Sequence, residues 1–296
     1  MIESKRGSFV PVAPGLDDPE GLVAKILPSS AVDGPGNRAV VFLQGCDFNC
    51  KYCHNPETRS GCIHCGLCVP ACPAGALSVY EGKVFWDSER CTDCGTCLQV
   101  CPHSSSPKAQ TLTVTEVLQR LSRYFPFIRG LTISGGECGL QAAFLTSLVR
   151  RARKIHQLGS LIDTNGSTDY SRLPELVEDA EGFMLDVKAW DGTEHRALTG
   201  APNDMVLKNL EYLGRLGKLY EVRTVVVPGL FNAEQTVCEV SRALVSCGSR
   251  ARYKIIAFRP QGVRPQYRDL PQPDRKQLDE LAMMARSMGV QEVIVV

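Results

Sequence analysis

The chain has 296 residues, with 33 Lys and Arg against 32 Asp and Glu and a formal net charge of +1. Its hydrophobic content of 44% and charged content of 22% are ordinary for a globular protein and argue against disorder. The balanced charge gives no sign of a nucleic-acid or membrane-surface binder, and no run of residues approaches the ~18 apolar positions of a membrane span.

The cysteines are the unusual feature of this composition. The first 21 residues lack the apolar core of a signal peptide, so we expect a cytoplasmic protein. Cysteine-rich cytoplasmic chains usually bind metal or perform redox chemistry, because a reducing cytosol does not favour disulfides. Eleven of the 14 cysteines lie between Cys46 and Cys101, and this concentration indicates where the function lies.

In chain order, residues 1–21 form a leader, and the run RAVVFLQGC from Arg38 predicts a buried parallel strand. Residues 57–107 are dense in Cys, Gly and Pro, which predicts an insertion. Beyond the insertion, β-rich runs alternate with amphipathic ones. The predicted strands span residues 131–136, 158–166, 182–190, 220–229, 252–260 and 290–296, and the predicted helices span 114–126, 139–156, 203–216, 233–247 and 272–287.

This alternation predicts right-handed βαβ units around a parallel sheet, and therefore an α/β fold. Polar residues follow several of the predicted strands, as in β/α barrels, whereas a doubly wound sheet gathers them near one switch point. We therefore expect a partial barrel of about six β/α units, formed by residues 22–56 and 108–296. The insertion, 57–107, interrupts this barrel.

The first cysteine group is CDFNCKYC, with Cys46, Cys50 and Cys53 in one tight loop. Three thiolates can hold three irons of a [4Fe–4S] cluster and leave the fourth iron open to a small molecule. A zinc loop completed by His54 is the alternative. Structural zinc sites usually divide their ligands into two separated pairs, which this loop does not do.

These residues carry a resemblance. CDFNCKYC is similar to the cluster signature of the radical S-adenosylmethionine (SAM) enzymes, and VDGPGNRAVVFLQGCDFNCKYCHNPET resembles the glycyl radical enzyme activating enzymes. The resemblance implies that SAM chelates the open iron and that one-electron reduction cleaves it to methionine and a 5′-deoxyadenosyl radical. It also implies that Tyr52 lies near the adenine, although a packing role under the cluster loop is the alternative.

Two further runs, CIHCGLCVPACP and CTDCGTCLQVCP, fit the pattern of bacterial two-cluster ferredoxins, in which the fourth Cys of each run serves the other cluster. We therefore expect residues 57–107 to form an α+β ferredoxin-like domain that carries electrons. Paired zinc knuckles are the alternative. The expected ligand sets are Cys62, Cys65, Cys68 and Cys101 for the second cluster, and Cys91, Cys94, Cys97 and Cys72 for the third.

Motifs at the strand ends resemble the SAM pocket of the same family. Gly135-Gly136-Glu137 resembles the motif that contacts the SAM amino group, since glycines allow close approach and a carboxylate accepts bonds from an ammonium. The resemblance also implies cofactor contacts from Asp163, Lys188 and Arg223. Where a His near SAM is expected, the sequence has Arg259, whose role is open.

Two carboxylates at adjacent strand ends repel one another unless a cation lies between them. The resemblance to pyruvate formate-lyase activase implies that this cation is monovalent, Na⁺ or K⁺, and lies beside SAM. An ordinary ion pair between Asp186 and Lys188 is the alternative. The implied cation ligands are Asp163, Thr164, Asp186 and the Met184 carbonyl.

Four residues near these motifs receive no catalytic role. Cys138, Cys238 and Cys247 fit no spacing pattern, and buried apolar thiols are common. We expect His54 to position the cluster loop.

The sequence therefore predicts an oxidoreductase that uses SAM to take a Cα hydrogen from a glycine of a partner glycyl radical enzyme. The expected electron donor is flavodoxin or ferredoxin, and neither nucleic acid nor membrane is an expected partner. Within the family the chain looks most like the YjjW type, which would make the partner YjjI-like. Two rivals remain: a radical SAM enzyme acting on a small molecule, similar to 7-carboxy-7-deazaguanine synthase, and a non-catalytic iron–sulfur electron carrier.

Overall fold

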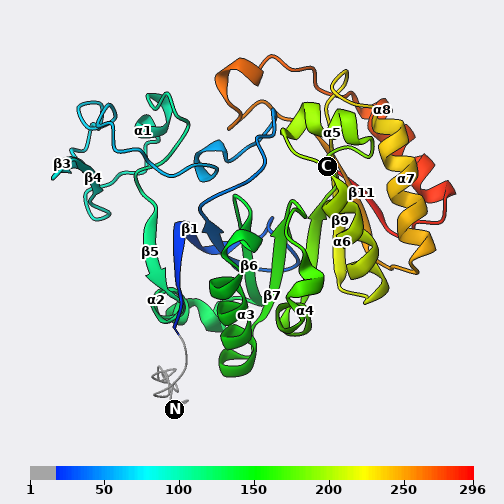
Figure 1. The fold of residues 1–296 in the computed structure, drawn as a ribbon, viewed down its shortest axis with the longest axis horizontal. Coiled ribbons are helices and arrows are strands. Elements are labelled where there is room, and N and C mark those ends of the chain that lie inside the picture. The colour runs from blue at the N-terminus through cyan, green and yellow to red at the C-terminus, as the bar shows by residue number, and fades with distance from the viewer. Residues whose placement is uncertain (1–17) are drawn as a thin grey trace, which may run out of the picture.

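The computed structural model describes residues 18–296, in which nine strands form one mixed sheet that carries helices along its outer face (Figure 1). Seven of the strands run parallel. They are β2 (Arg38–Leu43), β6 (Gly130–Gly135), β7 (Gly159–Thr164), β8 (Gly182–Asp186), β9 (Leu219–Val226), β10 (Arg252–Ala257) and β11 (Val293–Val295).

The strand order is β11-β10-β9-β8-β7-β6-β2-β1-β5. From β2 to β11 this order follows the chain without reversal, so right-handed crossovers place the helices on one face. The main helices are α2 (Val114–Leu121), α3 (Ala142–His156), α4 (Pro174–Asp179), α5 (Gly192–Thr199), α6 (Asp204–Arg215), α7 (Ala233–Ser246) and α8 (Arg275–Ser287). The arrangement lacks the switch point of a doubly wound sheet, as the sequence predicts.

Two strands extend the sheet at the insertion side. β1 (Glu20–Ser30) pairs antiparallel with both β2 and β5 (Gln110–Thr113). The sequence analysis missed both strands and also α4 and α5. β1 begins inside the predicted leader, whose residues before 18 lie outside the described part of the chain. Its polar residues and Pro28 hide the strand pattern, and the pairing with β2 is irregular between Leu27 and Ser30.

The sequence contains helix boundary residues at both ends of α5. Asp191 caps its N-terminus by accepting bonds from the backbone of Thr193 and Glu194, and Gly200 ends it with a φ of 78°. Both are ordinary helix boundary signals. The helix matters because it lies directly behind the first cysteine loop.

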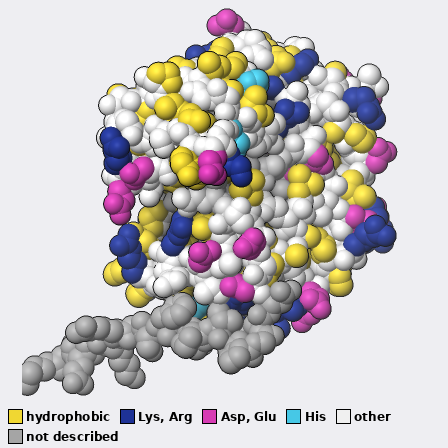
Figure 2. All heavy atoms as spheres, turned by 60° about the vertical axis from the view of Figure 1, so that its left-hand side comes forward, with side chains coloured by type: hydrophobic (Ala, Val, Ile, Leu, Met, Phe, Trp, Pro, Cys, Tyr) yellow, Lys and Arg dark blue, Asp and Glu magenta, His cyan; other side chains and the backbone are white. Residues whose placement is uncertain are grey.

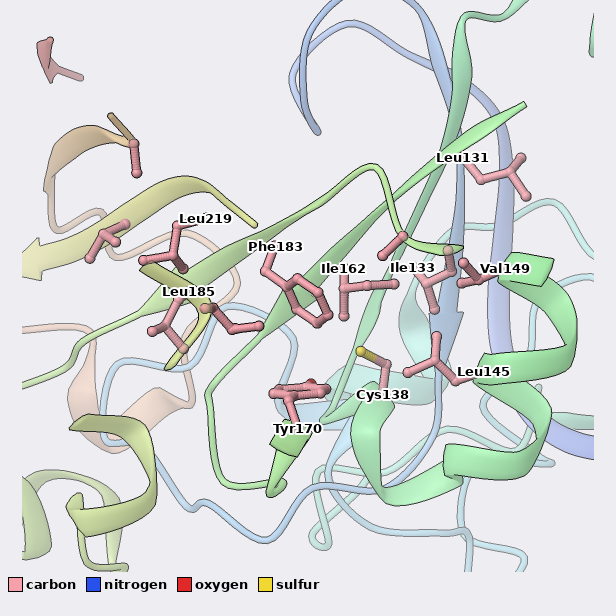
Figure 3. Packing of buried hydrophobic residues seen from close by; sticks show 14 of the residues in the cluster. Leu131, Ile133, Cys138, Leu145, Val149, Ile162, Tyr170, Phe183, Leu185 and Leu219 are labelled. Carbon is pink, nitrogen blue, oxygen red and sulfur yellow. The ribbon is translucent and has the colours of Figure 1, made fainter. Parts of the chain in front are cut away.

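The core lies between the sheet and its helices (Figure 3). Ile133 of β6 and Ile162 of β7 pack toward Leu145 and Val149 of α3, and all four side chains are fully buried. α3 presents these residues four apart, on one face, so its apolar stripe covers the sheet.

Residues 57–107 protrude from the sheet as a small separate lobe (Figure 1). The lobe holds the two-stranded hairpin β3 (Leu77–Tyr80) and β4 (Lys83–Trp86) and the short helix α1 (Thr96–Gln99). Glu81 and Gly82 join the strands with φ values of 46° and 71°, a pair of positive angles that suits a tight hairpin. Short 3-10 turns elsewhere are Pro56–Thr58, Ser122–Phe127, Cys138–Gln141, Tyr170–Arg172 and Pro265–Tyr267.

On the side of the molecule that carries this lobe, charges of both signs are scattered among apolar groups (Figure 2). This agrees with the near-neutral net charge of the chain. In residues 18–296, no helix is long and apolar enough to cross a membrane.

A buried ion pair joins β2, β6 and β7 at the amino ends of the strands. The Arg38 side chain is 0% exposed, lies 2.7 Å from the Glu181 carboxylate and also donates to the carbonyls of Leu131 and Gly159. A charge this deep must be neutralised and hydrogen-bonded, because removing it from water costs several kcal/mol.

We predict that Glu181→Ala lowers the free energy of unfolding by about 3 kcal/mol, because it leaves the Arg38 guanidinium buried without a counter-ion. Asp279→Ala is the control. It breaks an exposed pair with Arg275 on α8 and is expected to cost about 0.5 kcal/mol or less. Chemical denaturation followed by circular dichroism measures both, and equal effects would contradict the role of Arg38.

Candidate functional site

The thiols of Cys46, Cys50 and Cys53 line one cavity at the carboxyl end of β2, together with Gly135 and Gly136. Burial raises the pKa of the Cys46 thiol to about 12 and that of the Cys50 thiol to about 11. These cysteines therefore become thiolates at neutral pH only when a bound cation stabilises the negative charge. The arrangement suits a metal cofactor that contacts three sulfurs.

Backbone contacts hold the cysteine loop in place. The Cys46 amide donates to the Arg59 carbonyl at 3.0 Å, and the side-chain amide of Gln44 donates to the carbonyls of Glu57 and Ser60. The loop is therefore tied to the first residues of the insertion. On its other side it rests on α5, whose Thr199 carbonyl accepts from the Asn49 amide at 2.7 Å.

Two residues that the sequence analysis missed also hold this loop. Arg264 donates to the Cys50 carbonyl at 2.9 Å and to the Asn49 side chain at 2.7 Å. Asn165 donates its side-chain amide to the Cys46 sulfur at 3.6 Å and to Asp47 at 3.3 Å. Arg264 lies more than 200 positions along the chain from the loop, so no local pattern could reveal it.

His54 does not line the cavity of the three thiols and contacts the segment after β10. Its Nε2 atom lies 2.9 Å from the Arg259 carbonyl, and its ring stacks on Phe258 with centroids 6.3 Å apart. This position fits the expected role in holding the cluster loop and gives no support to a zinc site completed by His54. The Arg259 side chain is exposed.

Gly135 and Gly136, at the carboxyl end of β6, allow the backbone there to approach the backbone of Leu43 and Gly45 closely. A Cβ atom at Gly136 would lie 2.0 Å from the Gly45 carbonyl oxygen, and one at Gly135 would lie 2.2 Å from the Leu43 carbonyl oxygen. The Gly136 and Glu137 amides donate to Leu43 and Gly45 at 2.9 and 2.7 Å. The close approach that the glycines allow is thus to the cysteine loop itself, while their contact with SAM stays a prediction.

The Glu137 carboxylate is enclosed by donors from the chain itself. It is 0% exposed and accepts bonds from the amides of Asn165 and Gly139 and from the hydroxyls of Thr164 and Tyr170. Burial raises its pKa to about 7, against the lowering effect of the bonds from Asn165, Gly139 and Thr164. The side chain ties the ends of β6 and β7 together, and the contact of this motif with SAM stays a prediction.

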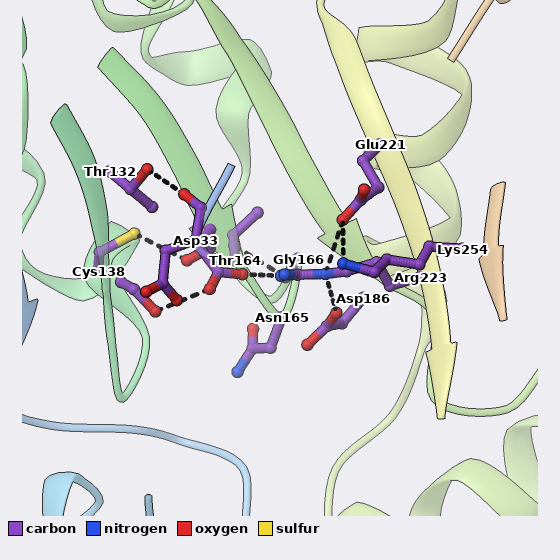
Figure 4. Close-up of polar contacts among 12 residues, drawn as sticks. Asp33, Thr132, Cys138, Thr164, Asn165, Gly166, Asp186, Glu221, Arg223 and Lys254 are labelled. Atoms are coloured by element: carbon purple, nitrogen blue, oxygen red, sulfur yellow. Dashed lines mark hydrogen bonds and ion pairs between the residues drawn. The ribbon is translucent and has the colours of Figure 1, made fainter. Parts of the chain in front are cut away.

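Arg223 of β9 reaches the carboxyl ends of β7 and β8, and Figure 4 shows its contact with Asp186. Its guanidinium donates to Asp163 of β7 and, at 2.8 Å, to Asp186 of β8. Burial lowers the pKa of Arg223 to about 10, which leaves it protonated at neutral pH. The Arg223 guanidinium therefore supplies the positive charge that the Asp163 and Asp186 carboxylates need between them.

A metal cation at the same place stays a prediction. Thr164, one of its expected ligands, directs its hydroxyl to Glu137 at 2.9 Å, and the Met184 side chain is buried. Within residues 18–296, no group of three or more His, Cys, Asp and Glu side chains is arranged to hold a single metal ion.

Lys188 lies between Asp186 and Tyr52. Its ammonium is 2.7 Å from the Asp186 carboxylate and 5.8 Å from the centre of the Tyr52 ring. Burial works to lower the pKa of Lys188, but Asp186 and nearby anionic groups outweigh it and raise the pKa well above its usual value. The ion pair that the sequence left as an alternative is present, and Tyr52 is buried beside it.

The eight cysteines of the insertion surround two small cavities. One is lined by Cys62, Cys65, Cys68 and Cys101, and the other by Cys72, Cys91, Cys94 and Cys97. The fold therefore brings the fourth cysteine of each run to the first three of the other run, and that each set holds a cluster stays a prediction.

The remaining cysteines lie outside all three cavities. Cys138 is fully buried and donates to the Asp163 carbonyl at 3.4 Å, and Cys247 contacts the Leu244 carbonyl in α7. Cys238 lies on α7 near Arg242. These positions match ordinary packing thiols.

The chain has relatives among characterised proteins. Residues 32–211, more than half of the chain, match the family model described as "4Fe-4S single cluster domain". The chain is 33% identical over 269 residues to the (2S)-3-sulfopropanediol sulfolyase activating enzyme of Bilophila wadsworthia, covering 83% of this chain and 87% of the relative. It is 32% identical over 233 residues to the choline trimethylamine-lyase activating enzyme of Oleidesulfovibrio alaskensis, covering 73% and 75%.

A solved structure, QueE from Escherichia coli, superposes with a TM-score of 0.52 at 12% identity and covers 94% of each chain. This likeness extends to the fold alone. It supports the α/β fold of the described chain.

We predict that Gly136→Ala displaces the cysteine loop, because its methyl group would overlap the Gly45 carbonyl oxygen. The cost is expected to be about 1–3 kcal/mol in the free energy of unfolding, the usual range for overpacking. Gly61→Ala is the matched control, since a Cβ atom there meets no atom within 4 Å. If thermal unfolding shifts equally in both variants, the backbone contact does not hold the loop.

Proposed function

Because this chain belongs to the glycyl radical enzyme activating enzymes, radical SAM oxidoreductases that bind a 4Fe-4S cluster, we propose that it installs the radical on a glycine of a partner enzyme. The observation that supports this proposal most directly is the cavity at the carboxyl end of β2. It is lined by the three cysteines of one loop and by no fourth cysteine. A cubane cluster held there keeps one iron free for a ligand.

SAM is the ligand that we propose for this open iron, on the family resemblance and on the charges around the cavity. When bound, the reduced cluster and SAM supply a 5′-deoxyadenosyl radical that removes one Cα hydrogen from the substrate glycine. Lys188 and Arg223 offer positive charge for the SAM carboxylate, and their carboxylate partners fix both side chains in place.

We propose further SAM contacts from groups near the first cysteine loop. The backbones of Gly135 and Gly136 border the cysteines, and Tyr52 offers an aromatic face close to Lys188. Glu137 acts through its backbone position, since its carboxylate is engaged inside the protein. Asp163, Thr164, Asp186 and the Met184 carbonyl would hold a monovalent cation only if Arg223 moved away from the two carboxylates.

We propose that residues 57–107 form a ferredoxin-like domain with two further [4Fe–4S] clusters. Support comes from the two sets of four cysteines, each of which lines one cavity of the lobe. Four thiolates leave no open iron, so these clusters carry electrons. Cys65 and Cys94 are the exposed members of the two sets, where flavodoxin or ferredoxin can approach.

The partner in this proposal is a glycyl radical enzyme. The YjjW-type resemblance suggests a YjjI-like protein, whereas the relatives at 33% and 32% identity activate a sulfolyase and a choline lyase.

The test is to combine reduced protein and SAM with candidate glycyl radical enzymes under anaerobic conditions. We expect 5′-deoxyadenosine together with the electron paramagnetic resonance signal of a glycyl radical on the partner. SAM turnover without this signal for any partner would favour the small-molecule enzyme, and no SAM turnover at all would favour an electron carrier.

We predict that Cys46→Ala abolishes SAM cleavage while most of the iron stays bound. Reconstituted wild-type protein should contain about twelve irons, from about four per cluster, and the variant about eight. Cys138→Ala is the control, since this thiol lies outside the three cavities. Iron analysis and product assay measure both properties, and loss of all iron from the Cys46 variant would refute the division between one catalytic and two electron-carrying clusters.

A further inference from the structure

The two cysteine cavities of the insertion differ in charge. Lys108 lines the cavity of Cys72, Cys91, Cys94 and Cys97, which Trp86 also borders. The described residues that line the cavity of Cys62, Cys65, Cys68 and Cys101 include no lysine or arginine, and its polar members are His103 and Ser105. Each site is lined by four cysteines, so the two sites differ in the charge that surrounds those thiols.

The Lys108 ammonium is held inside the lobe. Its side chain is 14% exposed, and the ammonium lies 5.8 Å from the centre of the Trp86 ring. Its counter-ion, Asp93, lies 2.7 Å away, but the Asp93 side chain is 73% exposed. Water screens the exposed carboxylate more than the enclosed ammonium, so positive charge dominates at the cavity.

Trp86 adds a hydrogen-bond donor on the same side. Its indole nitrogen is buried and has no acceptor within residues 18–296. Lys108 and Trp86 both line this cavity, so an ammonium and an unpaired N–H group favour negative charge there.

Reduction adds one electron, and so one negative charge, to an iron–sulfur cluster. Nearby positive charge and donors to the ligand sulfurs stabilise the reduced form and raise the reduction potential. We propose that Lys108 and Trp86 raise the potential of the cluster held by Cys72, Cys91, Cys94 and Cys97 above that of the other insertion cluster. An electron delivered by the flavodoxin or ferredoxin donor then resides mainly on the cluster beside Lys108.

This inference rests on the two insertion clusters of the proposed function and assigns them different roles. The cluster beside Lys108 stores the electron. The cluster of Cys62, Cys65, Cys68 and Cys101 holds it less tightly and passes it on. That second cluster lies on the side of the first cysteine loop, because Cys101 shares a cavity with Arg59 and Arg264, and both arginines bond the backbone of that loop.

The experiment is a redox titration of the reconstituted full-length protein, followed by electron paramagnetic resonance and with iron content measured. In Lys108→Gln, which can still hydrogen-bond Asp93, we expect one of the insertion potentials to fall. The expected change is about tenfold in the equilibrium constant for reduction, or about 59 mV for a one-electron couple. Lys108→Arg keeps the charge and should restore the wild-type value.

Further variants separate charge from structure. Asp93→Asn removes the counter-ion and should raise the same potential, while Trp86→Phe keeps the ring, removes the donor and should lower it. Ser105→Ala should change the potential of the other insertion cluster, which Cys101 helps to hold, because the Ser105 hydroxyl lies 3.7 Å from the Cys101 sulfur. Lys83→Gln is the matched control, since Lys83 is exposed on β4 and lines neither cavity.

The proposal is supported when Lys108→Gln lowers one potential and leaves the other unchanged. It is overturned if both potentials stay fixed or both fall equally, or if Lys83→Gln has the same effect. If the protein binds about twelve irons per chain but no potential shifts, the proposed effect of Lys108 and Trp86 is wrong, while the two insertion clusters are unaffected. About four irons per chain would overturn the insertion clusters of the proposed function, and this inference with them.

Discussion

The contact between Gly136 and Gly45 is the constraint on which the rest of the site depends. At this point the end of β6 and the start of the cysteine loop lie within hydrogen-bond distance, backbone against backbone. Only residues without a Cβ atom permit such an approach. The contact fixes the loop at the carboxyl edge of the sheet, so that Cys46 and its two partners face one cavity beside the neighbouring strand ends.

Charge is arranged around this edge so that each buried ion has a partner. Glu137 receives four donors, Arg223 lies between two aspartates, and Lys188 is paired with one of them. Buried charges are stable only with such partners, and partners of this kind also hold side chains in fixed positions. The side chains of Arg223 and Lys188 are thereby held in fixed positions at the ends of the neighbouring strands.

The insertion follows another principle, because its order comes from the cysteines more than from its small core. Few apolar side chains are buried in this lobe, and Cys68 and Cys97 are themselves among them. Its two cavities require the cysteine runs to cross, so each run helps to close both sites. If the lobe binds the two proposed clusters, it gains stability from them, since metal binding and folding are coupled in small metal-binding domains.

The sequence by itself determined the features that depend on local spacing. The parallel strands, the helices between them and the grouping of eleven cysteines follow from periodicity and motif, because each depends on residues near one another in the chain. β1 was missed because edge pairing, and not its own pattern, makes it a strand. Only the tertiary structure decided that Arg264 and Asn165 hold the cysteine loop, that Arg223 lies between two carboxylates, and that Lys108 borders one cavity of the insertion. These contacts join residues far apart in the chain, and their geometry arises only when the sheet has formed.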